Sequence, residues 1–313
     1  MTVPTDSFPP VRRLGPDDLK RCVALSVDRG WSPERAKWSL LLAASEVFGI
    51  DAPDRKGLAG AVVLTRWAPD FASVGMMLVA ARYGRRGLGR ALMEHLLAAA
   101  GDGATVTLFA TDLGRPLYEK LGFEPVRRNV SFTGQFRAAA NADNSKKRGA
   151  PTAASTTCPD ASAGSPGGVR SAAEADLPAI LALDRAAFGA DRGAVLERLP
   201  SFADRIAVLE SRDLAGQGIA GYAAAWRNDP ASTIIGPLVA PDGAAARLLV
   251  TELAASARTP VRLDLDPDRP ELPGWANAHG LEPAGLTVVM AHGKLPERGT
   301  PERLFAPISV ALA

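Results

Sequence analysis

The sequence predicts an α/β chain made of two successive copies of one fold, and three observations support this prediction. Segments with strand and helix patterns alternate along both halves. Short motifs of the first half recur in the second half in the same order, which is typical of a duplicated fold. A polar stretch without periodicity, residues 138–168, separates the copies. At 313 residues we therefore expect two domains, 1–137 and 169–313, joined by a flexible linker.

The first half opens with a short strand and two helices. Residues 11–14 predict the strand, and Pro16, a residue favoured at the first position of helices, begins a helix that runs to about Val27. Ser32-Pro33, as N-cap and first helical residue, predicts a second helix to about Ala44.

Three strands follow, and Pro-Asp turn signals between them predict antiparallel pairing. They cover residues 48–52, 58–67 and 71–79. After the next loop and helix come a strand, a short helix that ends at Gly122, and a last strand, over residues 105–110, 115–121 and 126–136. Strands interleaved with helices suit a mixed, mostly antiparallel twisted sheet covered by helices on both faces.

A glycine- and arginine-rich loop, Gly84-Arg-Arg-Gly-Leu-Gly-Arg90, lies between a strand and a helix. The helix follows from Leu88, Leu92 and Leu96, which recur at helical spacing. The N–H groups of its first turn have no partner inside the helix, and the helix dipole adds positive potential there. Glycine lets a ligand approach the backbone, and the arginines add charge. We therefore expect a phosphate-binding site at this loop.

A second motif, Leu117-Tyr-Glu-Lys-Leu-Gly-Phe123, follows downstream. In order and spacing the two motifs resemble those of the GNAT superfamily of N-acetyltransferases, and the resemblance covers about residues 11–135. It implies that the loop binds the pyrophosphate of acetyl-CoA. The residues expected to contact it are Gly84, Arg85, Arg86, Gly87, Leu88, Gly89 and Arg90. The usual first Arg or Gln of the loop is Gly84 here, so one side chain is missing while the backbone donors remain.

The same resemblance assigns the rest of the site. The pantetheine arm of acetyl-CoA is expected to pair with the backbone of Met77, Leu78 and Val79 as an added strand. Thr111 stands where the family often has an asparagine that contacts pantetheine, and Gly114 leaves room for the cofactor.

Tyr118 is the expected general acid, which protonates the departing thiolate. A phenol has a pKa near ~10 and is therefore protonated at neutral pH. The alternative interpretation of Tyr118 is a half-buried aromatic residue that packs beside Leu121 and Phe123.

A general base is less evident. Glu46 and Asp70 lie near strands that border the expected acceptor cleft, although each is also a plausible solvated carboxylate. His95 lies beside the apolar stripe of its helix, which predicts a packed or half-exposed ring, and His279 and His292 have no ligand-like spacing. An amine that arrives neutral needs no base.

The second copy lacks this chemistry. Its counterpart of the anion loop is Gly236-Pro-Leu-Val-Ala-Pro-Asp-Gly243, where Pro241 removes a backbone donor and Asp242 would repel phosphate while capping the next helix. Ala276 stands at the position of Tyr118. We expect a non-catalytic domain that is structural or shapes the acceptor site.

Composition favours a cytoplasmic protein that binds neither nucleic acid nor membrane. The net charge is +2 with acids and bases interspersed, and no apolar run approaches the ~20 residues that span a bilayer. The first ten residues do not resemble a signal peptide. Cys22 and Cys158 are too few and too far apart for a disulfide framework or a metal site.

The combined prediction is an N-acyltransferase that moves an acetyl group from acetyl-CoA to a primary amine of an unidentified small molecule or protein. The alternative is a non-catalytic acyl-CoA-binding or scaffold protein. The intact Gly-x-Gly loop and Tyr118 favour the enzyme. A tandem acetyltransferase of thiol biosynthesis is disfavoured, because the second halves of those enzymes look catalytically intact.

Overall fold

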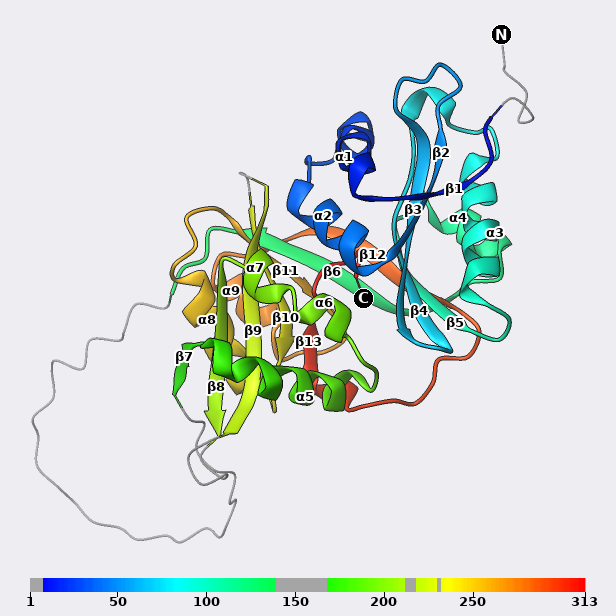
Figure 1. The fold of residues 1–313 in the computed structure, drawn as a ribbon. Coiled ribbons are helices and arrows are strands. Elements are labelled where there is room, and N and C mark those ends of the chain that lie inside the picture. The colour runs from blue at the N-terminus through cyan, green and yellow to red at the C-terminus, as the bar shows by residue number, and fades with distance from the viewer. Residues whose placement is uncertain (1–7, 139–167, 212–217, 230–231, 313) are drawn as a thin grey trace, which may run out of the picture.

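A computed structural model of the chain describes residues 8–138, 168–211, 218–229 and 232–312. The expected linker, with Cys158, lies outside the described residues apart from its two ends. Figure 1 shows strands running through the whole molecule, with helices packed against them in each half.

The first half forms the expected elements in the expected order. They are β1 (Arg12–Leu14), a 3-10 turn (Pro16–Asp18), α1 (Leu19–Asp28), α2 (Arg35–Ala44), β2 (Glu46–Asp51), β3 (Leu58–Ala68), β4 (Phe71–Val79), a 3-10 turn (Ala81–Tyr83), α3 (Leu88–Ala100), β5 (Thr105–Ala110), α4 (Arg115–Lys120) and β6 (Glu124–Gly134). The antiparallel pairing of β2, β3 and β4 is confirmed.

Several boundaries differ from the prediction by one or two residues, including the starts of α2, β2 and β6. Helix α2 begins at Arg35 and not at Pro33, because Glu34 adopts a left-handed conformation with φ 48°. Its carboxylate lies 2.5 Å from the ammonium group of Lys37, and both side chains are buried. The ammonium nitrogen of Lys37 also lies 5.9 Å from the centre of the Trp226 ring of the other half, a long-range contact that a local capping signal cannot reveal.

The second half repeats the plan and adds a terminal strand. Its elements are β7 (Val169–Ser171), a 3-10 turn (Glu174–Asp176), α5 (Leu177–Phe188), α6 (Gly193–Leu196), α7 (Leu199–Phe202), β8 (Arg205–Ser211), β9 (Gly218–Asp229), β10 (Ser232–Val239), α8 (Gly243–Ala254), β11 (Val261–Leu265), α9 (Pro273–Ala278), β12 (Glu282–His292), a 3-10 turn (Pro301–Arg303) and β13 (Leu304–Ala306). The repeat extends to single side chains. Arg12 donates two hydrogen bonds to Asp18, and Arg170 donates two to Asp176.

The strands of both halves form one sheet, in the order β1-β2-β3-β4-β5-β12-β6-β11-β10-β9-β8-β7, with β13 beside β10. At the centre the last strands of the halves are exchanged. β12 pairs with β5 of the first half, β6 pairs with β11 of the second, and β6 and β12 pair with each other. The α/β class with two related units is confirmed, and the exchange joins their sheets.

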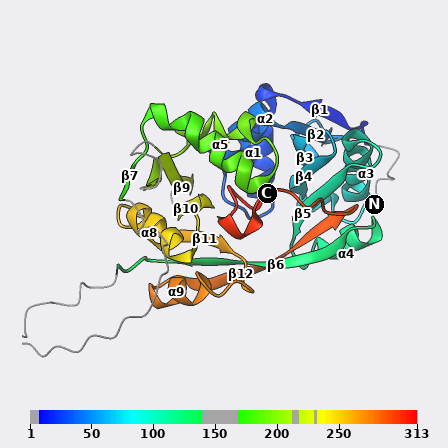
Figure 2. The same cartoon turned by 90° about the horizontal axis from the view of Figure 1, so that it is seen from below.

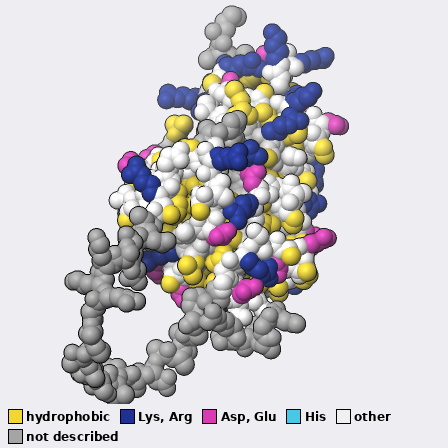
Figure 3. Space-filling view, turned by 90° about the vertical axis from the view of Figure 1, so that its left-hand side faces the viewer, with side chains coloured by type: hydrophobic (Ala, Val, Ile, Leu, Met, Phe, Trp, Pro, Cys, Tyr) yellow, Lys and Arg dark blue, Asp and Glu magenta, His cyan; other side chains and the backbone are white. Residues whose placement is uncertain are grey.

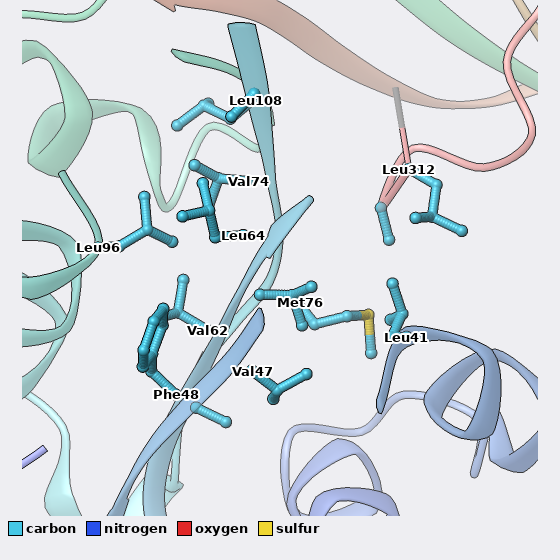
Figure 4. Packing of buried hydrophobic residues seen from close by; sticks show 14 of the residues in the cluster. Leu41, Val47, Phe48, Val62, Leu64, Val74, Met76, Leu96, Leu108 and Leu312 are labelled. Carbon is cyan, nitrogen blue, oxygen red and sulfur yellow. The ribbon is translucent and has the colours of Figure 1, made fainter. Parts of the chain in front are cut away.

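Helices cover both faces of the sheet. We call the face that carries α1, α2 and α5 the inner face, and the face that carries α3, α4 and α8 the outer face; in Figure 2 the three inner helices lie together between the two halves. Figure 4 shows Leu96 and Leu108 on the outer side of β4, whereas Met76, Leu41 and Leu312 meet on the inner side. The end of the chain is therefore part of the first half's core.

Charged side chains of both signs are distributed over the surface. On the face drawn in Figure 3, Lys and Arg are more numerous toward the top, and acidic and basic side chains are interspersed below. None of the described helices has the length and apolar character needed to cross a membrane.

Candidate functional site

In the first half, strands β4 and β5 pair over only part of their length and then separate. The two strands pair in parallel from Phe71 opposite Thr105 to Val74 opposite Leu108. Met76 then adopts φ 49°, and the pairing of β4 with β3 shifts register at the same place. Such a bulge bends a strand. Beyond it β4 keeps its pairing with β3 alone, so the other backbone edge of Met77, Leu78 and Val79 has no strand partner among the described residues.

The glycine-rich loop lies directly after this open edge. Arg85 and Gly87 both adopt left-handed conformations, with φ 58° and 78°, and Gly87 is the N-cap of α3 without a side-chain cap. The first helical bond near the loop runs from Ala91 N–H to the carbonyl of Gly87. The N–H groups of Leu88, Gly89 and Arg90 thus precede the helical ladder and can bind an anion.

The arginines of the loop differ in their surroundings. Arg85 is exposed and makes no ion pair within the described residues, whereas Arg90 pairs with Glu94 at 2.7 Å along the helix. The guanidinium of Arg86 lies over the Tyr83 ring, 5.6 Å from its centre. Arg82, which the loop motif did not include, covers the same ring at 4.8 Å. Its signal in the sequence is only its position one turn before the loop.

Two glycines allow the elements of the site to pack closely. A Cβ on Gly89 would lie 3.1 Å from Cε of Met77 and 3.3 Å from Cδ2 of Leu117, so α3 approaches β4 and α4 at this point. A Cβ on Gly114 would lie 3.0 Å from Cε2 of Tyr118. A larger residue at position 114 would therefore crowd the tyrosine ring.

Tyr118 lies on α4 with its side chain buried and its ring 5.9 Å from that of Phe123. Burial raises the pKa of Tyr118 to about 12. Its hydroxyl makes no hydrogen bond to any described residue. With this raised pKa, the hydroxyl remains protonated at neutral pH. The start of α4 is held by Thr111, whose hydroxyl accepts the N–H of Gly114 at 3.3 Å.

The structure places neither candidate base at the open edge of β4. Glu46 accepts a hydrogen bond from Arg66 at 2.6 Å. Asp70 lies in the turn before β4, at the opposite end of the strand from Val79, and pairs with Arg298. Both carboxylates therefore serve ion pairs.

The three histidines have packing roles. His95 contacts the Phe48 ring, His279 stacks on Phe136, and His292 contacts Phe123. Within the described ranges, no cluster of three His, Cys, Asp or Glu side chains is arranged to hold a metal ion. Burial raises the pKa of Cys22 to about 12, so its thiol is not reactive at neutral pH.

In the second half the corresponding strands, β10 and β11, also separate, but β13 occupies the open edge of β10. β10 and β11 pair in parallel only at Thr233 opposite Val261 and Ile234 opposite Arg262. Both β4 and β10 end in Leu-Val before an alanine, but Leu238 and Val239 pair with β13, so their edge is occupied.

Two of the differences predicted for the second copy, at Asp242 and Ala276, are present. The carboxylate of Asp242 accepts the N–H of Ala245 at 2.8 Å and caps α8. Ala276, at the position of Tyr118, is fully buried.

Comparison with known proteins finds the same type of domain in each half. Residues 44–125 and residues 180–306 each match an acetyltransferase (GNAT) domain. An uncharacterized N-acetyltransferase of Bacillus subtilis, YitH, is 29% identical over 200 residues. That match covers 64% of this chain and 62% of the relative's length.

Solved structures share the whole architecture. A Pyrococcus horikoshii protein assigned to the acetyltransferases aligns over 100% of this chain and 98% of its own, with a TM-score of 0.76 and 18% identity. A GCN5-related N-acetyltransferase from Sphaerobacter thermophilus aligns over 93% and 96%, with a TM-score of 0.58 and 18% identity. A tandem GNAT protein from the clavulanic acid biosynthesis pathway aligns over 91% and 99%, with a TM-score of 0.58 and 16% identity. At these identities the likeness concerns the fold.

Proposed function

Because the chain belongs to the GNAT acetyltransferase family and carries two such domains in tandem, we propose that it transfers an acetyl group from acetyl-CoA to a primary amine. The acceptor belongs to a small molecule or a protein. In this proposal residues 1–137 form the catalytic domain, and residues 169–313 form a non-catalytic one.

The observation that supports the proposal most directly is the open edge of β4. The amide groups of pantetheine can pair with the free backbone groups of Met77, Leu78 and Val79, as an added strand would. The pyrophosphate then reaches the N–H groups at the start of α3, with Arg85 beside it. Because this mode of binding uses backbone N–H groups, it does not require the Arg or Gln side chain that the family usually has at the position of Gly84.

In the transfer, the nitrogen of a neutral amine attacks the thioester carbonyl, and a C–N bond forms as the C–S bond breaks. The amine loses one proton and the departing thiolate gains one. A backbone N–H of β4 can stabilise the negative charge that develops on the carbonyl oxygen. Tyr118 supplies the proton to sulfur in this proposal, because its hydroxyl is protonated and is not engaged by other residues.

The test has two parts. Calorimetry measures acetyl-CoA binding by the full chain, and CoA release is then followed with a thiol reagent over a panel of amines. Tight binding with amine-dependent CoA release supports the enzyme. Tight binding without release for any amine favours the alternative of a non-catalytic acyl-CoA-binding protein, and no binding contradicts both.

A further inference from the structure

A pocket that is open to solvent lies on the inner face where the two halves meet, with a cavity volume of about 80 Å³ for water-sized molecules. Three aromatic side chains form much of its wall, namely Phe109 of β5, Phe188 of α5 and Phe305 of β13. Polar groups reach it from β6 and from the end of β11. The pocket therefore requires both halves, and neither copy could form it alone.

One end of the pocket adjoins the place where the thioester is expected. Phe109 directly follows Leu108, the last β5 residue that pairs with β4. Across the sheet, Phe109 pairs with Val289 and Val289 pairs with Arg127, so these three side chains lie on the same face. Two inter-strand spacings separate Phe109 from Arg127, roughly 10 Å between their backbones.

Four arginines and two aspartates line the pocket, but most of these charges are already committed. Arg192 is buried and pairs with Asp184, with 2.9 Å between Nε and Oδ2. Arg128 pairs with Asp268. Arg269 donates to the carbonyl of Leu304 at 2.8 Å.

The aspartates are also partly engaged. Asp264 is 3% exposed, accepts the hydroxyl of Ser131 and pairs with Arg262 at 2.9 Å. Asp266 accepts the N–H of Asp268 at 2.9 Å through Oδ1 and forms no ion pair within the described residues.

Arg127 is the arginine of this set that forms no ion pair. Its guanidinium lines the pocket and makes neither an ion pair nor a hydrogen bond with any described residue, and the carboxylate of Asp266 is the opposite charge that interacts with it. A guanidinium in a partly enclosed pocket binds a carboxylate or phosphate through paired, charge-assisted hydrogen bonds.

We propose that this pocket is the acceptor site, and that it selects a small amine that also carries an anionic group, a carboxylate or a phosphate. The anionic group binds Arg127, the body of the molecule lies between the phenylalanines, and the amine points to the Phe109 end. This inference rests on the proposed transfer reaction, which supplies the amine's role as nucleophile.

The experiment compares Arg127→Gln with Arg137→Gln in the full chain. Arg137 is an exposed arginine just beyond the end of β6 and away from the pocket, so its replacement removes the same charge from the same segment. The probes are amino acids with their amides, and phosphoethanolamine with ethanolamine. Calorimetry measures their binding, and CoA release measures turnover.

We expect the wild-type protein to prefer the anionic member of at least one pair. Arg127→Gln should raise the Kd and KM of that anionic amine about ten- to a hundredfold. The values for its neutral partner and for acetyl-CoA should stay unchanged, and Arg137→Gln should behave as wild type. If the amino acids are preferred over their amides, the pocket binds a carboxylate. If phosphoethanolamine is preferred over ethanolamine, it binds a phosphate.

Absence of any preference for anionic amines would overturn the assignment, as would equal losses in the two variants. Arg127-dependent binding of an anionic amine without CoA release would keep the pocket and contradict the acetyltransferase activity. The two ideas therefore fail separately.

Discussion

The surroundings of Tyr118 are compatible with both interpretations that the sequence left open, a packed aromatic residue and a general acid. Its ring packs against Phe123 as a core aromatic would, while its hydroxyl has no hydrogen-bond partner among the described residues. With a pKa of about 12, the phenol keeps its proton until the pH rises toward that value. Any loss of activity between pH 8 and 10 must then come from another group.

Replacing Tyr118 with Phe should lower kcat about 100- to 10,000-fold, the usual contribution of a general acid, because the packed ring is kept and one proton donor is lost. The Kd of acetyl-CoA should not change. Steady-state kinetics with the acceptor found in the panel, together with calorimetry, measure both. Wild-type turnover by Tyr118→Phe would show that water or another group protonates the thiolate.

Asp18 allows a second test at this scale. Its carboxylate accepts hydrogen bonds from Arg12 and from the N–H of Gly15, which lowers its pKa to about 2. The lowered pKa means that Asp18 stabilises the fold above its unfolded-state pKa near ~4 and loses this effect as the pH falls through 2.

Asp18→Asn should therefore reduce the free energy of unfolding by about 1–3 kcal/mol at pH 6, and the difference from wild type should shrink below pH 4. Urea unfolding at several pH values measures this. The neighbouring Asp17 is exposed, so Asp17→Asn is the matched control. A difference that persists unchanged at pH 2.5 would mean that the ion pair is not its cause.

At the residue scale, sequence patterns identified those residues whose amino-acid type is characteristic of the role that we assign to them. The loop glycines and Tyr118 belong to motifs, and Asp242 is a capping residue by its chemistry. Arg82 and the close contact of Gly114 with Tyr118 could not be found this way. They depend on how a turn and a helix are placed in three dimensions.

At the scale of elements, α3 is a helix with contrasting ends. Gly87 at its N-cap and Gly101 at its C-cap both have positive φ, 78° and 97°, so a Cβ strains the backbone at either position. Only the first lies at the expected phosphate site. Comparing substitutions at the two glycines therefore separates an effect of backbone strain from an effect on ligand binding.

Gly87→Ala and Gly101→Ala should each lower the free energy of unfolding by about 1–2 kcal/mol, because alanine disfavours the left-handed region. Only Gly87→Ala should also weaken acetyl-CoA binding, by tenfold or more. Thermal unfolding and calorimetry on the two variants measure the two effects. Equal affinities for acetyl-CoA would place the phosphate elsewhere.

Helices and strands of the first half were predictable because their periodicity is local. The neighbours of β6 and β12 were not, since nothing in either strand states which of two equivalent partners it pairs with. The bulge at Met76 was equally hidden, because methionine gives no hint of a positive φ.

At the scale of the whole molecule, the two copies have diverged at one comparable groove. The edge that β4 leaves open is covered in β10 by β13, from the same chain. The chain that follows β13 passes close to Gly236 and then to Gly75 of β4. A Cβ on Gly75 would lie 2.2 Å from the carbonyl oxygen of Ala311. The end of the second half thus fills its own groove and supports the inner side of β4.

We expect the full chain to bind one acetyl-CoA because, among the described residues, β4 has an open edge and the equivalent edge of β10 is paired with β13. Titration calorimetry should give a stoichiometry of about one per chain, and Gly87→Ala should weaken this binding without revealing a second site. A stoichiometry of two would show that β13 can be displaced from β10.

Separate expression of residues 1–137 and 169–313 should not yield two stable proteins. β6 would leave its partners β11 and β12, and β5 would lose β12, so each half would expose unpaired strand edges. Co-expression should recover a complex that co-purifies. Independent, cooperative unfolding of either half alone would contradict this expectation.

The exchanged strands also constrain how the protein can fold while it is being made. β5 is complete at Ala110, but its neighbour β12 ends at His292, about 180 residues later. At ribosomal rates of ~5–20 residues per second, that interval lasts roughly 10 to 35 seconds. During this time the edge of β5 that later pairs with β12 lacks that partner. The first half would thus be synthesised first, yet its sheet would be completed only near the end of translation.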